Sequence, residues 1–88
     1  MGWTIEYAAS VRKTVAKLDP ATRRRLRDFL ETRVAGLDDP RSLGQALSGP
    51  LGGLWRYRVG DWRIICDIRD RRLVVLVLRI GRRREVCR

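Results

Sequence analysis

The sequence predicts a small α+β domain with the element order β-α-α-β-β-β, in which an N-terminal helical hairpin packs on one face of an antiparallel sheet. Three observations predict this fold: an apolar alternation near the N-terminus, two stretches of helical spacing with almost no linker between them, and three strand-like runs with short turns after residue 53. Because 88 residues leave room for one hydrophobic core, we expect a single domain over residues 1–88.

The first strand and the two helices are predicted from spacing and capping. The segment WTIEY (3–7) alternates in the manner of a short strand. Apolar residues then recur at helical spacing as far as Leu18, with basic residues between them, which indicates an amphipathic helix. Asp19 and Pro20 supply an N-cap and a proline at the first helical position, so a second helix begins there and ends at Gly36.

The segment after the second helix is rich in proline and glycine, which predicts an irregular connection. We expect its leucines, Leu43, Leu47 and Leu51, to hold it against the domain. Strands are predicted at residues 54–59, 62–68 and 73–78. The last of these contains VVLVL, which is apolar at successive positions, so we expect it to be the central strand with both faces covered.

Gly60 and Asp61 predict a two-residue hairpin, since glycine suits the first central position of a type II′ turn. This turn pairs Val59 with Trp62, Arg58 with Arg63, Tyr57 with Ile64 and Arg56 with Ile65. Because cross-strand partners share a face and neighbours alternate, Arg56, Arg58 and Arg63 lie together on the face that the helices leave uncovered. The aromatic residues Trp55, Tyr57 and Trp62 fall on the opposite face, which favours core packing over stacking on bases.

The charge is strongly basic and unevenly distributed. Lys and Arg number 20 against 10 Asp and Glu, a net charge of +10, and residues 54–88 contribute +7 of it. Such a field attracts polyanions. The three clustered arginines have two interpretations, a solvated strand face or a phosphate-binding site, because a guanidinium fork matches phosphate oxygens two at a time. A second basic run, Arg82 to Arg84, is either a solvated tail or the other wall of one groove beside Arg63.

Several classes of protein are not expected from this sequence. It has no long apolar run and no signal-peptide pattern, so we expect a cytoplasmic protein. Cys66 and Cys87 are too few for a disulfide framework, and the sequence contains no histidine. Free thiols and the absence of a metal or other cofactor are therefore expected.

The residues that carry the basic clusters also resemble a known family. The blocks LWRYRVGDWRII and IGRRREV, within a resemblance that covers essentially the whole chain, are similar to the RelE branch of the RelE/ParE superfamily of bacterial toxins. The resemblance implies the toxin of a type II toxin–antitoxin system, a ribosome-dependent mRNA endonuclease neutralised by a cognate antitoxin. Operator DNA is contacted only through the antitoxin, and no membrane partner is implied.

Site residues follow from this resemblance position by position. Arg56 and Arg58 match the paired basic residues of the family, Arg63 matches its phosphate-binding arginine, and Arg83 matches the arginine two residues past the glycine. Cys87 occupies the position where the family commonly has a tyrosine, and Arg82 stands where relatives often have histidine. The expected catalytic residues are thus Arg56, Arg58, Arg63, Arg83 and Cys87, with Arg82 and Arg84 binding substrate.

Two other functions remain open at the level of sequence. ParE-type relatives poison DNA gyrase without cutting RNA, and the missing histidine and tyrosine fit that activity as well. A basic RNA-binding module without toxicity is the third possibility.

Overall fold

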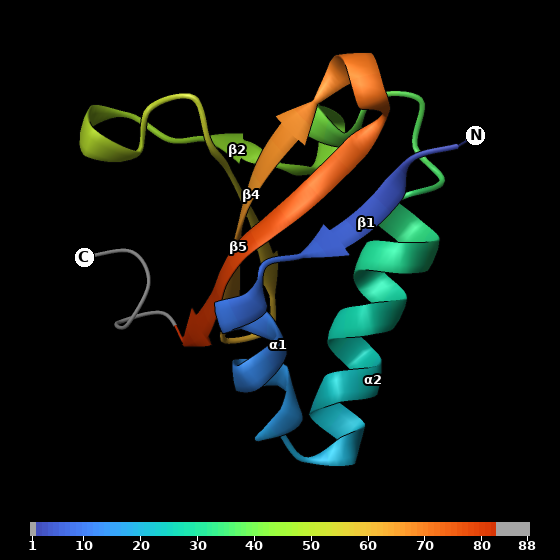
Figure 1. The fold of residues 1–88 in the computed structure, drawn as a ribbon, viewed down its shortest axis with the longest axis vertical. Coiled ribbons are helices and arrows are strands. Elements are labelled where there is room, and N and C mark those ends of the chain that lie inside the picture. Colours follow the sequence, from blue (N-terminus) through green and yellow to red (C-terminus); the bar gives the residue numbers. More distant parts are fainter. Residues whose placement is uncertain (1, 83–88) are drawn as a thin grey trace.

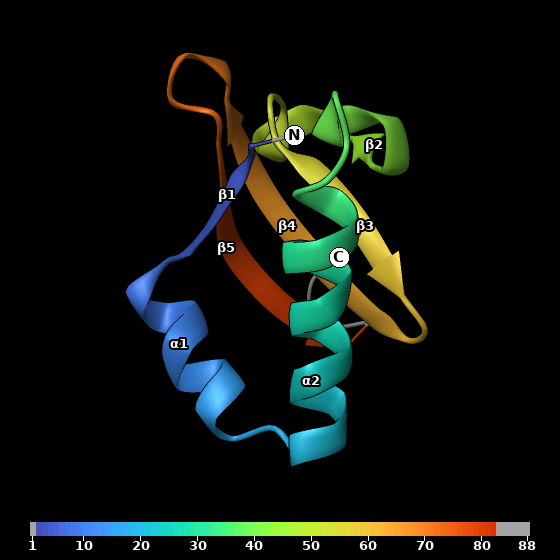
Figure 2. The ribbon, with the colours of Figure 1, turned by 90° about the vertical axis from the view of Figure 1, so that its right-hand side faces the viewer.

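A computed structural model describes residues 2–82 of the chain, and within them a sheet of five strands carries helices on one face (Figure 1). The strands run in the spatial order β1-β5-β4-β3-β2. Their bounds are β1 Thr4–Tyr7, β2 Gln45–Ala46, β3 Trp55–Val59, β4 Trp62–Arg69 and β5 Val74–Arg82. The helices α1 (Ala9–Ala16) and α2 (Pro20–Asp28) both lie on the same side of this sheet (Figure 2).

The helical hairpin forms where the caps predict it. The Asp19 carboxylate accepts a hydrogen bond of 3.1 Å from the backbone N–H of Thr22, and Pro20 follows at the first helical position. After Asp28 the helix continues as a π-helical turn, Phe29–Val34, and the Ala35 N–H donates to the Leu30 carbonyl at 2.9 Å. None of the helices described is long and apolar enough to cross a bilayer.

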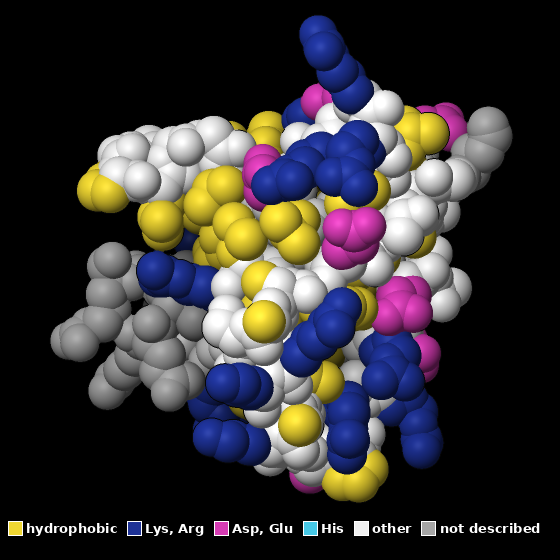
Figure 3. Space-filling model, in the orientation of Figure 1, with side chains coloured by type: hydrophobic (Ala, Val, Ile, Leu, Met, Phe, Trp, Pro, Cys, Tyr) yellow, Lys and Arg dark blue, Asp and Glu magenta, His cyan; other side chains and the backbone are white. Residues whose placement is uncertain are grey.

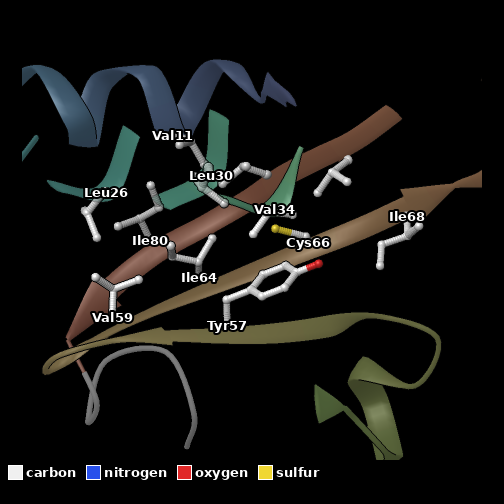
Figure 4. Close-up of a cluster of buried hydrophobic side chains, with 12 residues drawn as sticks. Val11, Leu26, Leu30, Val34, Tyr57, Val59, Ile64, Cys66, Ile68 and Ile80 are labelled. Carbon is white, nitrogen blue, oxygen red and sulfur yellow. The ribbon is translucent and has the colours of Figure 1, made fainter. Parts of the chain in front are cut away.

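The core lies between the helices and the sheet. Leu26, Leu30 and Val34 from the second helix meet Tyr57 and Ile64 from the β3–β4 hairpin (Figure 4). Tyr57 is fully buried, and its hydroxyl donates to the Pro40 carbonyl at 2.7 Å, so the polar end of this core side chain is satisfied.

The predicted fold class is confirmed, and the sheet proves to be mixed. β1 pairs in parallel with β5, whereas the other neighbouring strands are antiparallel. A parallel neighbour requires a long crossover, and the chain from α1 to β4 supplies it. The expected central strand, now β5, is an interior strand between β1 and β4, while β4 occupies the middle of the sheet.

The β3–β4 hairpin confirms the predicted turn and register. Gly60 has φ of 60°, and Leu73 is the one described non-glycine residue with positive φ, so Asp61 has the negative φ of a type II′ turn. Arg58 pairs with Arg63 and Tyr57 with Ile64, as the two-residue loop requires. β4 also carries a register shift between Ile65 and Cys66 where it pairs with β5.

The connection before β3 contains the 3₁₀ helices Pro40–Leu43 and Gly49–Leu51 on either side of β2. Arg41 ties it to the β4–β5 turn, because its two terminal nitrogens donate to the carboxylate of Asp70 at 2.9 and 2.7 Å. Leu43 does not hold the connection down as expected. It is 38% exposed, since it borders an open groove.

Candidate phosphate-binding face

The face of the sheet opposite the helices gathers arginines from three strands. In one row across the sheet, Arg58 pairs with Arg63 and Arg63 with Gly81. In the next row, Arg56 pairs with Ile65 and Ile65 with Arg79. We call the four basic residues of these rows, Arg56, Arg58, Arg63 and Arg79, the arginine face.

Arg79 was not among the residues predicted for the site. It pairs with Ile65, and it is exposed on the same face as Arg63. Counting back two positions from Gly81 along a strand places Arg79 on the same face as Gly81, since residues two apart share a face. The β4–β5 register is what sets that face beside Arg63.

Arg63 is the most buried member of the arginine face. It is 6% exposed, and its Nε lies buried without a hydrogen-bond partner. Gly81, directly across the ladder, has no side chain, which leaves space for the guanidinium beside the strand. The sequence predicted that this face of the sheet is uncovered, yet the Arg63 side chain on it is buried. A buried guanidinium that keeps an unsatisfied donor is suited to an anionic ligand.

No ion pair described within residues 2–82 joins a carboxylate to Arg58, Arg63 or Arg79. The acidic partners in the described ion pairs belong elsewhere: Asp39 and Asp70 pair with Arg41, and Asp67 pairs with Arg69. Arg56 instead donates to the side-chain oxygen of Gln45, its cross-strand partner on β2. A neutral amide thus helps to orient this guanidinium.

Arg82 lies on the other face of the sheet from Arg63. It pairs with Trp62, and its guanidinium carbon sits 5.4 Å from the centre of a Trp62 ring, a cation–π contact. Its predicted role in binding substrate stays a prediction. Arg83, Arg84 and Cys87 lie outside the described residues, so their predicted roles also stay predictions.

The predicted aromatic placement is confirmed, and it limits the proton-transfer groups available. Trp55 and Trp62 pack against the core from the helix-covered face, on which Tyr57 is fully buried. Tyr7 also lies on that side, and its hydroxyl donates to Glu31 at 2.5 Å. Burial and then this hydrogen bond raise the pKa of Tyr7, and burial raises the pKa of Tyr57. Neither phenol lies on the arginine face.

Cys66 is a structural thiol. It is fully buried in the core, and burial raises its pKa far above the ordinary range. A thiol in such surroundings is inert as a nucleophile or proton donor. Cys87 is therefore the one cysteine left as a candidate for chemistry.

The sequence matches a family of small toxins. Residues 5–87 match the family model described as the ParE toxin of the type II toxin–antitoxin system parDE. The chain thus belongs to the RelE/ParE superfamily of type II toxins. No curated protein matches the sequence significantly.

Solved structures of RelE toxins share this fold. The toxin–antitoxin complex RelBE2 from Mycobacterium tuberculosis matches with a TM-score of 0.85 at 24% identity, over 94% of this chain and 93% of that chain. The RelE–RelB complex from Pyrococcus horikoshii matches at 0.73 and 24% identity, over 98% and 100%. The intact E. coli RelBE complex matches at 0.73 and 18% identity, over 92% and 96%.

Proposed function

We propose that this toxin is a metal-independent mRNA endonuclease that acts on the ribosome. The observation that carries the proposal is the arginine face, above all the buried Arg63 with an unsatisfied Nε beside Arg58. Guanidinium groups fixed in a sheet provide preorganised positive charge where a scissile phosphate gains negative charge in the transition state. A solvated strand face would not leave a buried donor without a partner.

The reaction uses a nucleophile that RNA itself supplies. The 2′-oxygen attacks the adjacent phosphorus, the bond from phosphorus to the 5′-oxygen breaks, and the 2′-hydroxyl proton is balanced by one delivered to the leaving 5′-oxygen. The products are a 2′,3′-cyclic phosphate and a 5′-hydroxyl. Arg63 and Arg83 bind the scissile phosphate and stabilise the negative charge that develops on it. Arg56 and Arg58 alter the reactivity of the 2′-hydroxyl nucleophile.

The proposed site has weak groups for proton transfer. Arginine keeps its proton above pH 12 and is a poor base, which leaves Cys87 or Glu85 to move a proton. General acid–base assistance is worth about 10² to 10⁴ in rate, whereas positioning of reactants can contribute more. We therefore propose that the ribosome orients the message, and that the toxin acts in the cytoplasm where ribosomes are.

We further propose a cognate antitoxin as the protein partner. The similar structures from M. tuberculosis, P. horikoshii and E. coli are complexes of a RelE toxin with its RelB antitoxin. In this chain, a groove between α1 and α2 has an apolar floor that includes Val15, Leu18 and Leu26, and Arg12, Arg23 and Arg27 border it. Lys and Arg side chains gather over these helices (Figure 3). An acidic amphipathic helix complements this groove, and operator DNA is reached through the antitoxin.

Inhibition of DNA gyrase is the second candidate, because the matching family model is described as a ParE toxin. On this alternative the arginine face binds a protein or DNA surface and performs no chemistry. The two candidates make opposite predictions about the integrity of the message.

The test compares translating ribosomes treated with the toxin, with Arg63→Ala and with Arg83→Ala. New 5′ ends on the message are mapped and their terminal groups identified, with the exposed Arg72→Ala as a matched control. Cuts in the ribosomal A site that bear a 5′-hydroxyl, disappear in both variants and persist in the control support the nuclease. Intact message together with gyrase trapped on cleaved DNA overturns it in favour of the second candidate.

A further inference from the structure

A groove of about 470 Å³ runs beside the outer edge of β3, next to the arginine face. β2 pairs with β3 only at Trp55 and Arg56, so the rest of that edge has no neighbouring strand among the described residues. The groove is lined by Phe29, Arg33, Leu43, Gln45, Arg56 and Arg58. Two of these, Arg56 and Arg58, belong to the arginine face, whereas Arg33 comes from the helical layer.

The second helix brings basic residues to this edge through its spacing. The Phe29 ring packs edge-on against Tyr57, with 5.9 Å between ring centres, which fixes this side of the helix against β3. Four residues earlier, the guanidinium of Arg25 lies 3.1 Å from where a side chain on Gly60 would begin. Four residues later, Arg33 enters the groove. Residues spaced by four share one side of a helix, so the packing of Phe29 places arginines at both ends of the β3 edge.

The groove has the composition of a nucleic-acid site. No Asp or Glu lines it, and Arg33 and Arg58 form no ion pair within residues 2–82. Its apolar members, Phe29 and Leu43, are partly exposed and offer a surface for a base or sugar. Arg58 borders the groove and also pairs with Arg63, so one strand of RNA can contact both sites.

We propose that this groove binds the backbone phosphate of single-stranded RNA that neighbours the scissile phosphate, with Arg33 as a substrate-binding residue. The inference rests on the proposed nuclease function and extends its substrate from one phosphate to a segment of the message. RNA passes from the arginine face around the edge of β3 to the second helix. Arg33 supplies binding only, since Arg63 is not among the residues that line this groove.

The test measures binding without cleavage. A fluorescein-labelled single-stranded RNA of about 12 nucleotides, fully 2′-O-methylated so that no nucleophile is present, is titrated by fluorescence anisotropy at several salt concentrations. The variants are Arg33→Ala, Arg33→Lys, Arg58→Ala and Arg72→Ala. Arg72 is an exposed arginine in the β4–β5 turn that lines neither groove, and it controls for the loss of one charge.

We expect Arg33→Ala to raise the Kd about three- to tenfold and to reduce the slope of log K against log salt by about 0.7, the loss of one phosphate contact. Arg33→Lys should retain the slope, and Arg72→Ala should resemble the wild type. If Arg33→Ala behaves like Arg72→Ala while Arg58→Ala loses affinity, the groove proposal is overturned, whereas RNA binding by the arginine face is supported. If neither Arg33→Ala nor Arg58→Ala weakens RNA binding, both the groove proposal and RNA binding by the arginine face are overturned.

A second titration tests whether the groove binds RNA or an acidic protein. Polyglutamate of similar charge is titrated against the same variants. Loss of polyglutamate binding in Arg33→Ala with unchanged RNA binding would assign the groove to an acidic partner and overturn the proposal. Loss of RNA affinity that exceeds the loss of polyglutamate affinity supports it.

Discussion

Arg63 carries an energetic cost that the fold does not require. Its guanidinium is buried, its Nε has no hydrogen-bond partner, and its cross-strand neighbour Arg58 bears the same charge. Like charges directly opposite on a strand pair cost some tenths of a kcal/mol to about 1 kcal/mol, and an unsatisfied buried donor costs about 1 to 3 kcal/mol. Natural proteins accept such costs mainly at functional sites.

A variant that removes this charge should therefore gain stability and lose activity. Arg63→Met keeps the length of the side chain, and we expect its free energy of unfolding to rise by about 1 kcal/mol in urea denaturation. Message cleavage should fall by about 10² or more, because a preorganised cation is lost. Arg58→Met is the exposed control, and its stability should change by less than about 0.5 kcal/mol. A clear destabilisation of Arg63→Met would contradict the account of an unsatisfied guanidinium.

The residue at position 87 offers a test of the proton-transfer step. Cys87→Tyr introduces the phenol that the family resemblance predicts at this position, and we expect at least about a tenfold increase in cleavage rate on ribosomes. Cys87→Phe adds the ring without the hydroxyl and separates stacking from proton transfer. Equal rates for Cys87→Tyr and the wild type would show that this position does not take part in cleavage.

At the scale of the element, the β3–β4 hairpin is what gathers the arginines. Its two-residue turn sets the register, and a slip by one residue would move Arg58 and Arg63 to opposite faces. Gly60 makes this turn possible, because its φ of 60° is strained for most residues with a side chain.

Gly60→Ala should therefore lower both stability and function. We expect a loss of about 1 kcal/mol in the free energy of unfolding. The nearest atoms to the new methyl group belong to the exposed Arg25 side chain, which can move away, so the strain in φ decides the result. Gly60→Asn should lose less, since asparagine tolerates positive φ. The same stability in Gly60→Ala and Gly60→Asn would argue against this cause.

A second element-scale contact, between Arg41 and Asp70, secures the connection that precedes β3. The hydrogen bonds from Arg41 lower the pKa of the Asp70 carboxyl from its ordinary value of 3.8. A carboxyl with a lowered pKa stabilises the fold at pH values above its ordinary pKa, and this contribution is lost as the pH falls through the lowered value.

Asp70→Asn should thus be less stable than the wild type at neutral pH, and the difference should shrink below about pH 4. Urea midpoints measured across this range check the expectation. Asp61→Asn is the control, because Asp61 forms no ion pair within residues 2–82. A difference that stays constant with pH would mean that the charge of Asp70 is not what stabilises the turn.

At the scale of the whole molecule, the two sides of the sheet carry different sites. The groove between α1 and α2 lies on the helical side of the sheet, and the arginine face lies on the opposite side. The sheet separates these surfaces, so substitutions on one side should act independently of the other.

Reversing charge on the helical side should release the toxin from its antitoxin. In cells that co-express the cognate antitoxin, Arg23→Glu combined with Arg27→Glu is expected to stay toxic, whereas the wild type is neutralised. Co-purification of the antitoxin with each toxin gives the direct readout. Arg71→Glu combined with Arg72→Glu, at the exposed β4–β5 turn, controls for the change in net charge. Full neutralisation of the helical variant would place the antitoxin elsewhere.

From the sequence alone came the two helices, four of the five strands and one strand pairing, whereas β2 fell in the predicted irregular connection. Capping at Asp19 and helical spacing predicted the hairpin of helices, and the Gly60-Asp61 turn predicted which residues face one another across β3 and β4. These features are local: a turn type and a period of two are expressed within a few residues, so pattern alone carries them.

The features that join distant segments depend on the tertiary structure. It set β1 in parallel beside β5, brought Gln45 to Arg56, aligned Arg79 with the arginine face, buried Arg63 and carried Arg33 to the edge of β3. Each of these depends on how a long loop closes and which surfaces pack, and the free energies involved are sums over the whole core rather than properties of a local pattern.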